Sequence, residues 1–184
     1  EGNAVSNTYT LGYSFGSGVT IPGTGILMNN QMNNFAYRYG DKKERGRGAS
    51  TGNRFEPGKN PMSTMAPTMI FNKDGELMLV TGSPGGSLIP AAILRVITGI
   101  IDFDLDIGQA TMLPRVHKDW PTTGILYERT VNSDVVRIIN KRIGHKMTPE
   151  HTMGSTQSIH IIDGVNYGYA DLRRPGASVS SQEN

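Results

Sequence analysis

One stretch of the chain, residues 78–94, constrains the fold strongly because two apolar runs flank a cluster of glycines. Residues 77–80 are apolar without interruption, which is typical of a strand that is buried on both faces. After the glycines, apolar side chains recur with the period of a helix at positions 88, 89, 92, 93, 96 and 97. The stretch therefore predicts a strand, a tight loop and a helix.

The loop of this stretch contains Gly82, Gly85 and Gly86. Adjacent glycines at a strand-to-helix junction let the backbone approach a ligand closely, and N–H groups at a helix N-terminus suit an anion or a developing oxyanion. The alternative is a close-packed turn in which the glycines serve only the backbone geometry. The loop matches neither the phosphate-binding pattern with Gly-Lys-Ser/Thr nor G-x-G-x-x-G, so its spacing leaves both interpretations open.

The composition excludes several classes of site. The chain has 184 residues, the length of one domain, and no apolar run long enough to span a membrane. It has no cysteine, which excludes disulfides, thiolate catalysis and zinc–thiolate sites. Charged residues make up 18% of the chain and the net charge is +2, which does not favour a nucleic-acid partner. We therefore expect a soluble globular chain that neither inserts into a membrane nor binds nucleic acid.

Residues 36–60 form a long segment with almost no apolar periodicity, seven Lys or Arg and three acidic residues. Loops of more than about 12–15 residues are uncommon in compact domains unless they are lids, binding loops or disordered segments. A basic loop could contact nucleic acid, but few aromatic side chains accompany these charges. A long solvated loop that acts as a lid is the preferred interpretation.

Strands are expected near both ends of the sequence. Alternation of β-branched or aromatic residues with small polar ones predicts a first strand at 4–11. An Asp-Gly turn joins strands expected at 68–71 and 76–81, and a second Asp-Gly turn joins strands expected at 158–162 and 165–168.

Helices are expected between these strands. Asp106 is expected to cap a helix at 107–112. After a short strand at 125–128, Ser133 is expected to cap a helix that Gly144 ends. This order of elements predicts an α+β fold in which an antiparallel sheet packs against helices.

The sequence predicts no metal or cofactor site. Asp102, Asp104 and Asp106 alternate with apolar residues, but the Gly and Glu positions of a calcium-binding loop are missing. The four histidines, at 117, 145, 151 and 160, do not have the spacings of metal ligands.

Seven short motifs extend over nearly the whole chain. They are Asn3-Ala-Val5, Thr8-Tyr-Thr-Leu11, Gly23-x-Gly-Ile-Leu27, Asn29-Asn-Gln-Met-x-x-Phe35, Pro61-x-Ser-x-Met-Ala-Pro-Thr68, Thr81-Gly-Ser-Pro-Gly-Gly-Ser87 and Ala170-Asp-x-Arg173. In order and spacing they resemble the small subunit of the γ-glutamyltranspeptidases, also called glutathione hydrolases. Seven motifs in register make a chance likeness very improbable.

The resemblance implies a four-layer αββα N-terminal nucleophile hydrolase fold, of which residues 1–184 are the small-subunit portion. A precursor of this family cleaves itself into a large and a small subunit, and the new N-terminal threonine is the nucleophile, with its own α-amine as the base. It attacks the γ-glutamyl amide of glutathione and passes the acyl group to water, an amino acid or a peptide. We therefore expect a heterodimer with the large subunit and a location in the periplasm or at the cell surface.

The resemblance also implies roles for individual residues. Thr10 would hydrogen-bond the nucleophile, and Gly85 and Gly86 would form the oxyanion hole. The substrate α-carboxylate would lie against Ser63 and Thr64. Its α-amine would face a pair of carboxamides, Gln31 and Asn34, and segment 36–60 would cover the glutamate pocket as a lid.

The chain departs from the family pattern at four places. Family small subunits have a threonine start ahead of Gly2, so the nucleophilic threonine is expected upstream of Glu1 and the isolated chain is expected to be inactive. Asn34 stands where the family usually has Asp, which replaces an ion pair with the substrate ammonium by a neutral hydrogen bond. Gly12 stands where many members have Asn, and Thr64 where many have Ser.

These departures leave two alternatives to γ-glutamyl transfer. Asn34 suits an acyl group without an α-ammonium, such as glutaryl, so a related acylase is one alternative. A non-catalytic homologue that binds glutamate-like ligands or a partner is the other, because Gly12 and Asn34 both belong to the expected pocket.

Overall fold

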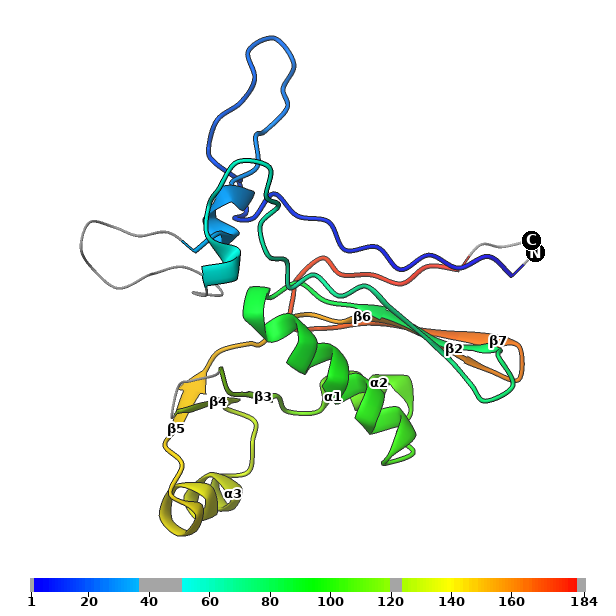
Figure 1. Cartoon of the computed structure of the whole chain (residues 1–184). Helices are drawn as coiled ribbons and strands as arrows, with labels where there is room; N and C mark the ends of the chain where they lie inside the picture. The colour runs from blue at the N-terminus through cyan, green and yellow to red at the C-terminus, as the bar shows by residue number, and fades with distance from the viewer. Residues whose placement is uncertain (1, 37–50, 120–123, 182–184) are drawn as a thin grey trace. The chain divides into compact units, whose positions relative to one another are not determined.

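A computed structural model describes residues 2–36, 51–119 and 124–181 (Figure 1). The chain divides into two compact units. One consists of Glu1–Thr8 and Met65–Asn184, and the other of Tyr9–Thr64.

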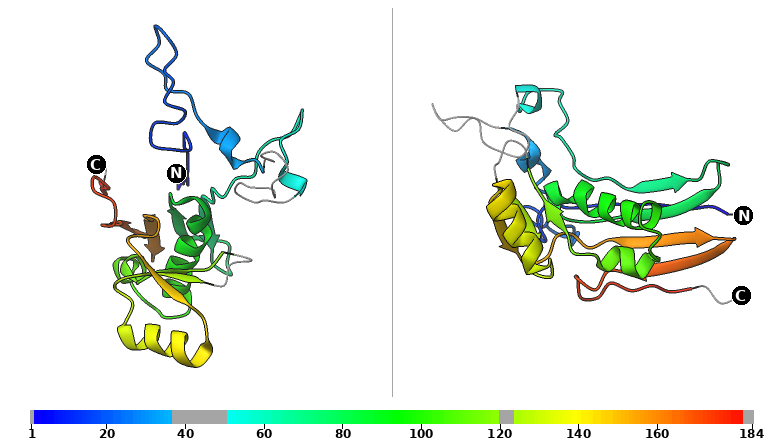
Figure 2. Two further views of the ribbon diagram at one scale, coloured as in Figure 1. Left: turned by 90° about the vertical axis from the view of Figure 1, so that its left-hand side faces the viewer. Right: turned by 90° about the horizontal axis from the view of Figure 1, so that it is seen from below.

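The larger unit contains a four-stranded antiparallel sheet with the strand order β1-β2-β6-β7. Its strands are β1 (Thr68–Phe71), β2 (Leu77–Gly82), β6 (Gln157–Ile162) and β7 (Val165–Ala170). The helices α1 (Ile89–Ile101) and α2 (Ile107–Met112) pack on one face of the sheet (Figures 1 and 2). This arrangement confirms the predicted α+β class and both predicted hairpins.

A second, three-stranded sheet of the larger unit has the order β3-β4-β5. It consists of β3 (Val116–His117), β4 (Ile125–Glu128) and β5 (Met147–Glu150), and β4 and β5 run parallel. The connection between β4 and β5 is α3 (Ser133–Ile138), which continues as a π-helical turn, η4 (Ile139–Ile143). The short 3-10 turns are η1 (Gln31–Asn34), η2 (Thr51–Asn53) and η3 (Gly86–Leu88).

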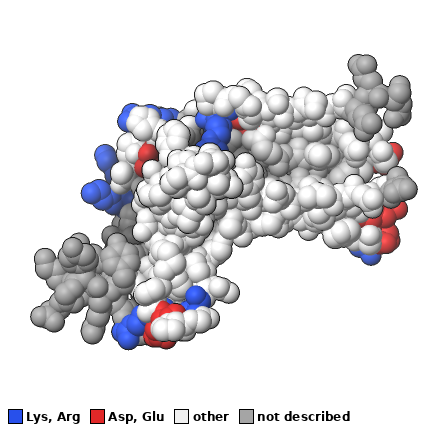
Figure 3. Space-filling model, turned by 90° about the horizontal axis from the view of Figure 1, so that it is seen from above, with Lys and Arg blue, Asp and Glu red and all other residues white. Residues whose placement is uncertain are grey.

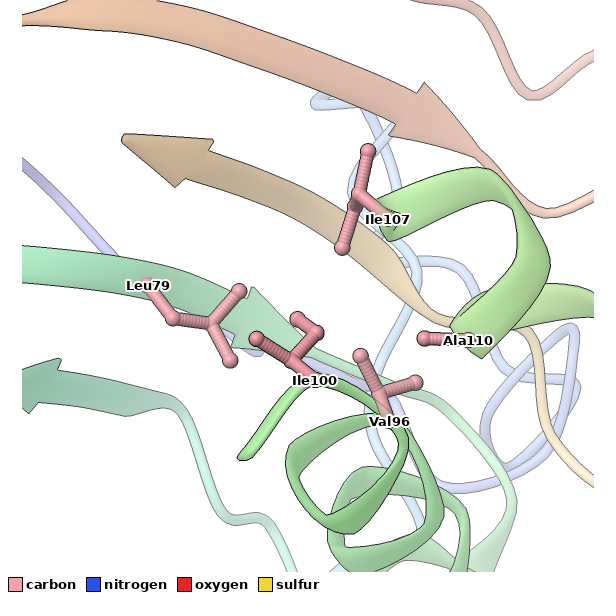
Figure 4. Close-up of a cluster of buried hydrophobic side chains, with 5 residues drawn as sticks. All are labelled: Leu79, Val96, Ile100, Ile107 and Ala110. Atoms are coloured by element: carbon pink, nitrogen blue, oxygen red, sulfur yellow. The ribbon is translucent and has the colours of Figure 1, made fainter. Parts of the chain in front are cut away.

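The stretch at 78–94 forms the predicted strand, loop and helix, and it supplies much of the core. Leu79 of β2 packs against Val96 and Ile100 of α1, together with Ile107 and Ala110 of α2 (Figure 4). The apolar period of the sequence thus marks the buried face of α1 correctly. Pro90 lies in the first turn, where its missing N–H has no hydrogen-bond partner to lose.

Gly99 lets α1 and α2 approach closely. A Cβ atom at this position would lie 2.9 Å from the Cβ atom of Ala110, which is too short for two carbon atoms in contact. A glycine normally weakens a helix interior by about 1 kcal/mol relative to alanine. Here the close helix contact accounts for the glycine.

The helix caps correct one prediction and confirm two. Asp106 caps α2 through a reciprocal pair of hydrogen bonds with Gln109, as expected from the sequence. Gly144 ends the following helix with a φ of 81°, also as expected. The N-cap of α3, however, is Asn132 and not Ser133, because the Asn132 side chain accepts the N–H of Asp134.

The predicted strand at 4–11 is wrong, since residues 2–11 have no regular secondary structure. Val5 and Tyr9 are 81% and 85% exposed, so the alternating pattern faces no core within this chain. In place of a strand ladder, one side chain holds the segment. The Ser6 Oγ donates to the carbonyl of Thr81 at 2.8 Å and accepts the N–H of Thr68 at 3.1 Å.

Four charged side chains form a buried network that the sequence analysis did not predict. Arg115 Nη2 lies 2.7 Å from Asp171 Oδ2, and the guanidinium of Arg173 binds both carboxylate oxygens of Glu128 at 2.7 and 2.8 Å. Arg173 also approaches Asp171 at 3.3 Å, which joins the two pairs. Arg115 and Asp171 are 2% and 0% exposed. The side chains of Arg173 and Glu128 are 8% and 4% exposed, so the network is largely shielded from water.

Both carboxylates of the network remain ionised. Burial by itself raises the pKa of Asp171, but the amide of Arg173 and the charge of Arg115 outweigh burial and hold that pKa below its ordinary value of 3.8. Burial likewise raises the pKa of Glu128. Hydrogen bonds from Arg173 and from the amides of Met153 and Arg115 outweigh it, so this pKa lies below 4.5. Two cations thus balance two anions at neutral pH.

The surface contrasts with this interior. On the face drawn in Figure 3, uncharged atoms predominate and Lys, Arg, Asp and Glu occur in small groups. Exposed ion pairs on a protein surface contribute at most about 1 kcal/mol, whereas removal of one partner from a buried pair costs about 3–5 kcal/mol. We therefore expect the loss of one partner to cost more stability in the buried network than in a surface pair.

Asp171→Asn tests this expectation, because it leaves the charge of Arg115 buried without its counter-ion. The free energy of unfolding of the complete protein should fall by about 3–5 kcal/mol in urea denaturation. The matched control is Asp134→Asn, which breaks the pair between Asp134 and Arg137, whose side chains are 65% and 63% exposed. That loss should stay below about 1 kcal/mol. Equal losses in the two variants would contradict the assignment.

Candidate functional site

The residues expected to form the site belong to both units. The smaller unit, Tyr9–Thr64, contains Thr10, Gln31, Asn34, Ser63 and Thr64, and the larger unit contains Gly85 and Gly86. Contacts within each unit define two groups of site residues. That the two groups meet in one pocket stays a prediction.

Hydrogen bonds join three of the predicted residues in the smaller unit. The Asn34 Nδ2 donates to the Gln31 Oε1 at 2.6 Å, and the Gln31 Nε2 lies 3.4 Å from the carbonyl oxygen of Thr10. The pairing of Asn34 with Gln31 follows from the 3-10 turn η1, which places side chains three residues apart on one side. Two carboxamides and the backbone of Thr10 thus form one polar group.

The chemistry of this group follows from the atoms that these contacts occupy. Among the described residues, no hydrogen bond reaches the Asn34 Oδ1, so this oxygen is available to accept one from a ligand. The Thr10 hydroxyl accepts the N–H of Gly12 at 2.8 Å and keeps its own proton for a further acceptor. A neutral acceptor and a hydroxyl donor suit a polar ligand such as an ammonium group next to an oxygen atom.

Asn53 is a residue of this unit that the sequence analysis missed. Its Nδ2 donates to the carbonyl of Asn34 at 2.7 Å, and its Oδ1 accepts the N–H of Met62 at 3.0 Å. Met62 directly precedes Ser63, so Asn53 connects the carboxamide group to the Ser63–Thr64 segment. No sequence pattern marked this residue. It lies in segment 36–60, which lacks apolar periodicity and was therefore expected to be a solvated loop.

Part of that segment is therefore packed. Asn53 is only 9% exposed, Ala36 bridges to Arg54, and the rings of Phe35 and Phe55 meet edge to face at 5.4 Å. The interpretation of residues 51–60 as solvated loop is corrected at these positions. The rest of the expected lid, residues 37–50, lies outside the described residues, and the lid itself stays a prediction.

The departure at Gly12 has a local explanation. Gly12 has a φ of 97°, and a Cβ atom there would overlap the side-chain oxygen of Asn30. That oxygen accepts the N–H of Tyr13 at 2.9 Å. An asparagine at position 12 would therefore have to displace the Asn30 side chain, and Gly12 fits the arrangement of this chain.

In the larger unit, the glycine loop follows β2 and precedes α1. Gly85 has a φ of 140° and Gly86 a φ of 60°, conformations that residues with a Cβ atom rarely adopt. Neither amide donates a hydrogen bond to another of the residues that the structure describes. The loop is thus both a turn that requires glycine and a place with two available N–H groups, so the two interpretations from the sequence are compatible.

The φ of Gly85 changes what a substitution there can reveal. From the sequence, Gly85→Ala is expected to lower turnover far more than stability. At a φ of 140° an alanine is strained by about 1–3 kcal/mol. The variant therefore alters stability as well, and it does not separate the two roles.

The described ranges contain neither a metal-ligand cluster nor a membrane-spanning helix. Residues 2–36, 51–119 and 124–181 contain no group of three or more His, Asp or Glu that could hold a metal ion. In the same ranges, every helix is too short or too polar to cross a membrane. The expectations about metals, cofactors and membranes stay predictions for the whole protein.

A sequence model of one protein family, described as Gamma-glutamyltranspeptidase, matches residues 1–181. This match covers nearly the whole chain and includes both groups of site residues. The chain belongs to the γ-glutamyltranspeptidase family.

Individual γ-glutamyltranspeptidases agree with this assignment. The chain is 40% identical to the glutathione hydrolase proenzyme of Escherichia coli over 174 residues, which cover 94% of this chain and 30% of the relative. A mutant γ-glutamyltranspeptidase of Helicobacter pylori has a TM-score of 0.86 and 35% identity, covering 94% of this chain and 95% of that chain. The enzyme of Pseudomonas nitroreducens has a TM-score of 0.85 and 34% identity, covering 98% and 95%.

The comparisons establish the fold class. The similar structures are γ-glutamyltranspeptidases, so the α+β arrangement is that of the N-terminal nucleophile hydrolases. The glutathione hydrolase relatives do not favour either alternative considered from the sequence, the glutaryl acylase or the non-catalytic homologue. The chain spans only about a third of the Escherichia coli proenzyme, at 30% of its length, which is consistent with a longer precursor.

The bridging contacts of Asn53 lead to a prediction for this γ-glutamyltranspeptidase. Asn53→Ala removes the acceptor of the Met62 N–H, so that amide should exchange with solvent several-fold to about tenfold faster in a hydrogen-exchange measurement. Asn72→Ala is the matched control, since Asn72 accepts the amides of Asp74 and Glu76 in the exposed turn between β1 and β2. It should leave the Met62 amide unchanged. An unaltered exchange rate at Met62 in Asn53→Ala would disprove the bridging role.

Proposed function

We propose that the complete protein hydrolyses glutathione and other γ-glutamyl amides and transfers the γ-glutamyl group to amino acids or peptides. The family match over residues 1–181 carries this proposal, and the relatives named glutathione hydrolase support it. The hydrogen-bonded group of Thr10, Gln31 and Asn34 is consistent with it, because a polar pocket wall is what a γ-glutamyl group requires.

The reaction is an acyl transfer in two halves. A threonine hydroxyl, expected upstream of Glu1, attacks the γ-carbonyl carbon of the substrate while its own α-amine takes the proton. The carbonyl oxygen becomes an oxyanion, which the N–H groups of Gly85 and Gly86 stabilise. The intermediate expels the amine of the leaving group, which takes the proton, and a γ-glutamyl ester of threonine remains. Water or the amine of an acceptor then attacks this ester by the same route.

The remaining site residues hold the glutamyl group. Hydroxyls of Ser63 and Thr64 donate to the α-carboxylate, and the Thr10 hydroxyl donates to the nucleophile. The α-ammonium donates to the Asn34 Oδ1, which the contact with Gln31 leaves available. The ammonium donor is ionised, so this hydrogen bond is charge-assisted, but the neutral acceptor lacks the opposite charge that an aspartate would supply.

The partner in this proposal is the rest of the same precursor, cleaved to form a large subunit. Apolar side chains on two faces of the larger unit remain uncovered in this chain alone. Leu94 of α1 is 58% exposed, Phe103 after it 63%, and Ile159 on β6 43%. A large subunit that covered these side chains would remove their apolar surface from water, which is favourable. The greater length of the relatives also supports a heterodimer. The family resemblance alone supports a location in the periplasm or at the cell surface.

One assay tests the substrate class. The complete processed protein is given the γ-glutamyl and the glutaryl anilides of p-nitroaniline, which differ only in the α-amine. We expect faster release of p-nitroaniline from the γ-glutamyl anilide, because the α-ammonium has an acceptor in Asn34. Faster release from the glutaryl anilide would overturn the proposal in favour of an acylase.

Asn34→Asp should increase the preference for γ-glutamyl over glutaryl substrates by roughly fivefold or more, since the α-ammonium then faces a carboxylate in place of a neutral amide oxygen. The new carboxylate requires the Gln31 amide to turn, so that Nε2 and not Oε1 faces residue 34. The measurement is the ratio of kcat/KM for the two anilides. An unchanged ratio would mean that residue 34 does not contact the α-amine.

A further inference from the structure

Ser83, between β2 and the glycine loop, is a buried residue whose hydroxyl is fully used. It is 2% exposed. Its Oγ donates to the carbonyl oxygen of Pro84 at 2.8 Å and accepts the N–H of Ser155 at 3.0 Å. With the donor and an acceptor position both engaged, the hydroxyl has one defined orientation.

The contact with Pro84 also orients Gly85. The carbonyl of Pro84 and the N–H of Gly85 belong to one planar trans peptide, so they point in opposite directions. A hydrogen bond that holds the carbonyl therefore holds the N–H as well. Ser83 points the Gly85 N–H away from the buried side, where Ser155 lies.

The next peptide is held in the same manner. The carbonyl of Gly85 accepts the N–H of Leu88 at 3.2 Å, which sets the direction of the Gly86 N–H. That bond is part of the turn η3 and depends on the backbone alone. The Gly85 peptide, in contrast, depends on one side chain.

Gly154 gives the Ser83 contact its close packing. A Cβ atom on Gly154 would lie 2.6 Å from the Ser83 Oγ and 3.1 Å from the Pro84 carbonyl oxygen. Only a glycine at this position lets the segment before β6 approach the loop closely enough for the Ser155 N–H to reach Ser83. The segment with Gly154 and Ser155 thus packs against the loop and holds it in place.

We propose that Ser83 is a positioning residue for the oxyanion hole, which it serves by fixing the direction of the Gly85 N–H. This inference rests on the proposed function, in which that N–H stabilises the oxyanion. Ser83 itself touches neither substrate nor nucleophile in this role. It acts before the reaction, by keeping the donor in place so that the donor need not reorient when charge develops.

The test compares Ser83→Ala with Ser158→Ala. Ser158 is also a buried serine, 4% exposed, and its hydroxyl lies 2.7 Å from that of Thr81 on the neighbouring strand. Both variants lose one buried hydroxyl from the same sheet region, but only Ser83→Ala frees the Gly85 peptide. Each is produced as two co-expressed chains with the small one starting at its threonine, so that activity does not depend on autoprocessing.

We expect Ser83→Ala to lower kcat and kcat/KM for the γ-glutamyl anilide by similar factors, about 10- to 100-fold, because a transition-state interaction is weakened. A boronic acid analogue, with boron in place of the γ-carbonyl carbon, forms a tetrahedral anion with the threonine hydroxyl. Its inhibition constant should rise by a similar factor. Ser158→Ala should change kcat, kcat/KM and the inhibition constant by less than about twofold each. It should lower the thermal stability about as much as Ser83→Ala does. The thiol of Ser83→Cys is a weaker donor and acceptor than a hydroxyl, so kcat and the inhibition constant of this variant should lie between those of the wild type and Ser83→Ala.

The outcomes separate this inference from the proposed function. A wild-type protein without γ-glutamyl activity would overturn the proposed function. An active wild type in which Ser83→Ala behaves like Ser158→Ala would overturn the positioning role, and so would a rise in KM with kcat unchanged. If the two chains of Ser83→Ala fail to assemble, the measurements on Ser83→Cys alone test the positioning role. Full activity with unchanged boronate inhibition in Ser83→Cys would also overturn the role.

Discussion

The larger unit depends on the ion pair of Arg115 with Asp171. Both groups are almost completely buried, and a charge in that position is tolerated only when its hydrogen bonds are nearly all made inside the protein. The partners come from distant parts of the chain. Arg115 follows α2, Asp171 follows β7, and Met153, whose carbonyl accepts Arg115 Nη1 at 2.6 Å, precedes β6. The two charges therefore fix three connecting segments at once.

The segment that leads from β5 to β6 joins this network to the glycine loop. The Met153 N–H donates to Glu128, the Ser155 N–H to Ser83, and the Thr156 N–H to Asp171. Two of these three amides are thus bound by the ion network, and the one between them by the loop of the expected oxyanion site. A glycine at 154 makes the close approach possible. The same short segment is important for stability on one side and for the direction of the Gly85 N–H on the other.

The smaller unit uses neutral hydrogen bonds in place of buried charges. Its carboxamides bond to each other and to the backbone, from Asn34 to Gln31 and from Asn53 to Asn34 and Met62. A run of carboxamides in the sequence is consistent with a turn or with a pocket wall. The structure confirms the turn, because η1 pairs two of the side chains. The pocket wall stays a prediction. Asn53 has no motif around it, and its position between two segments could be found only from their contacts.

The sequence by itself determined the strand, loop and helix at 78–94, the two hairpins, the cap at Asp106 and the family, since local periods, turn residues and short motifs are properties of neighbouring residues. It failed at residues 4–11, where the alternating pattern has no partner strand in the part of the chain that the structure describes, and one hydrogen-bonded serine takes the place of a ladder. Only the tertiary structure decided that Arg115 pairs with Asp171, that Gly99 fits against Ala110, and that Ser83 directs the Gly85 peptide. The physical reason is distance along the chain. Desolvation and close contact act between residues far apart along the chain, such as Ser83 and Ser155 at 72 positions, and no local pattern records them.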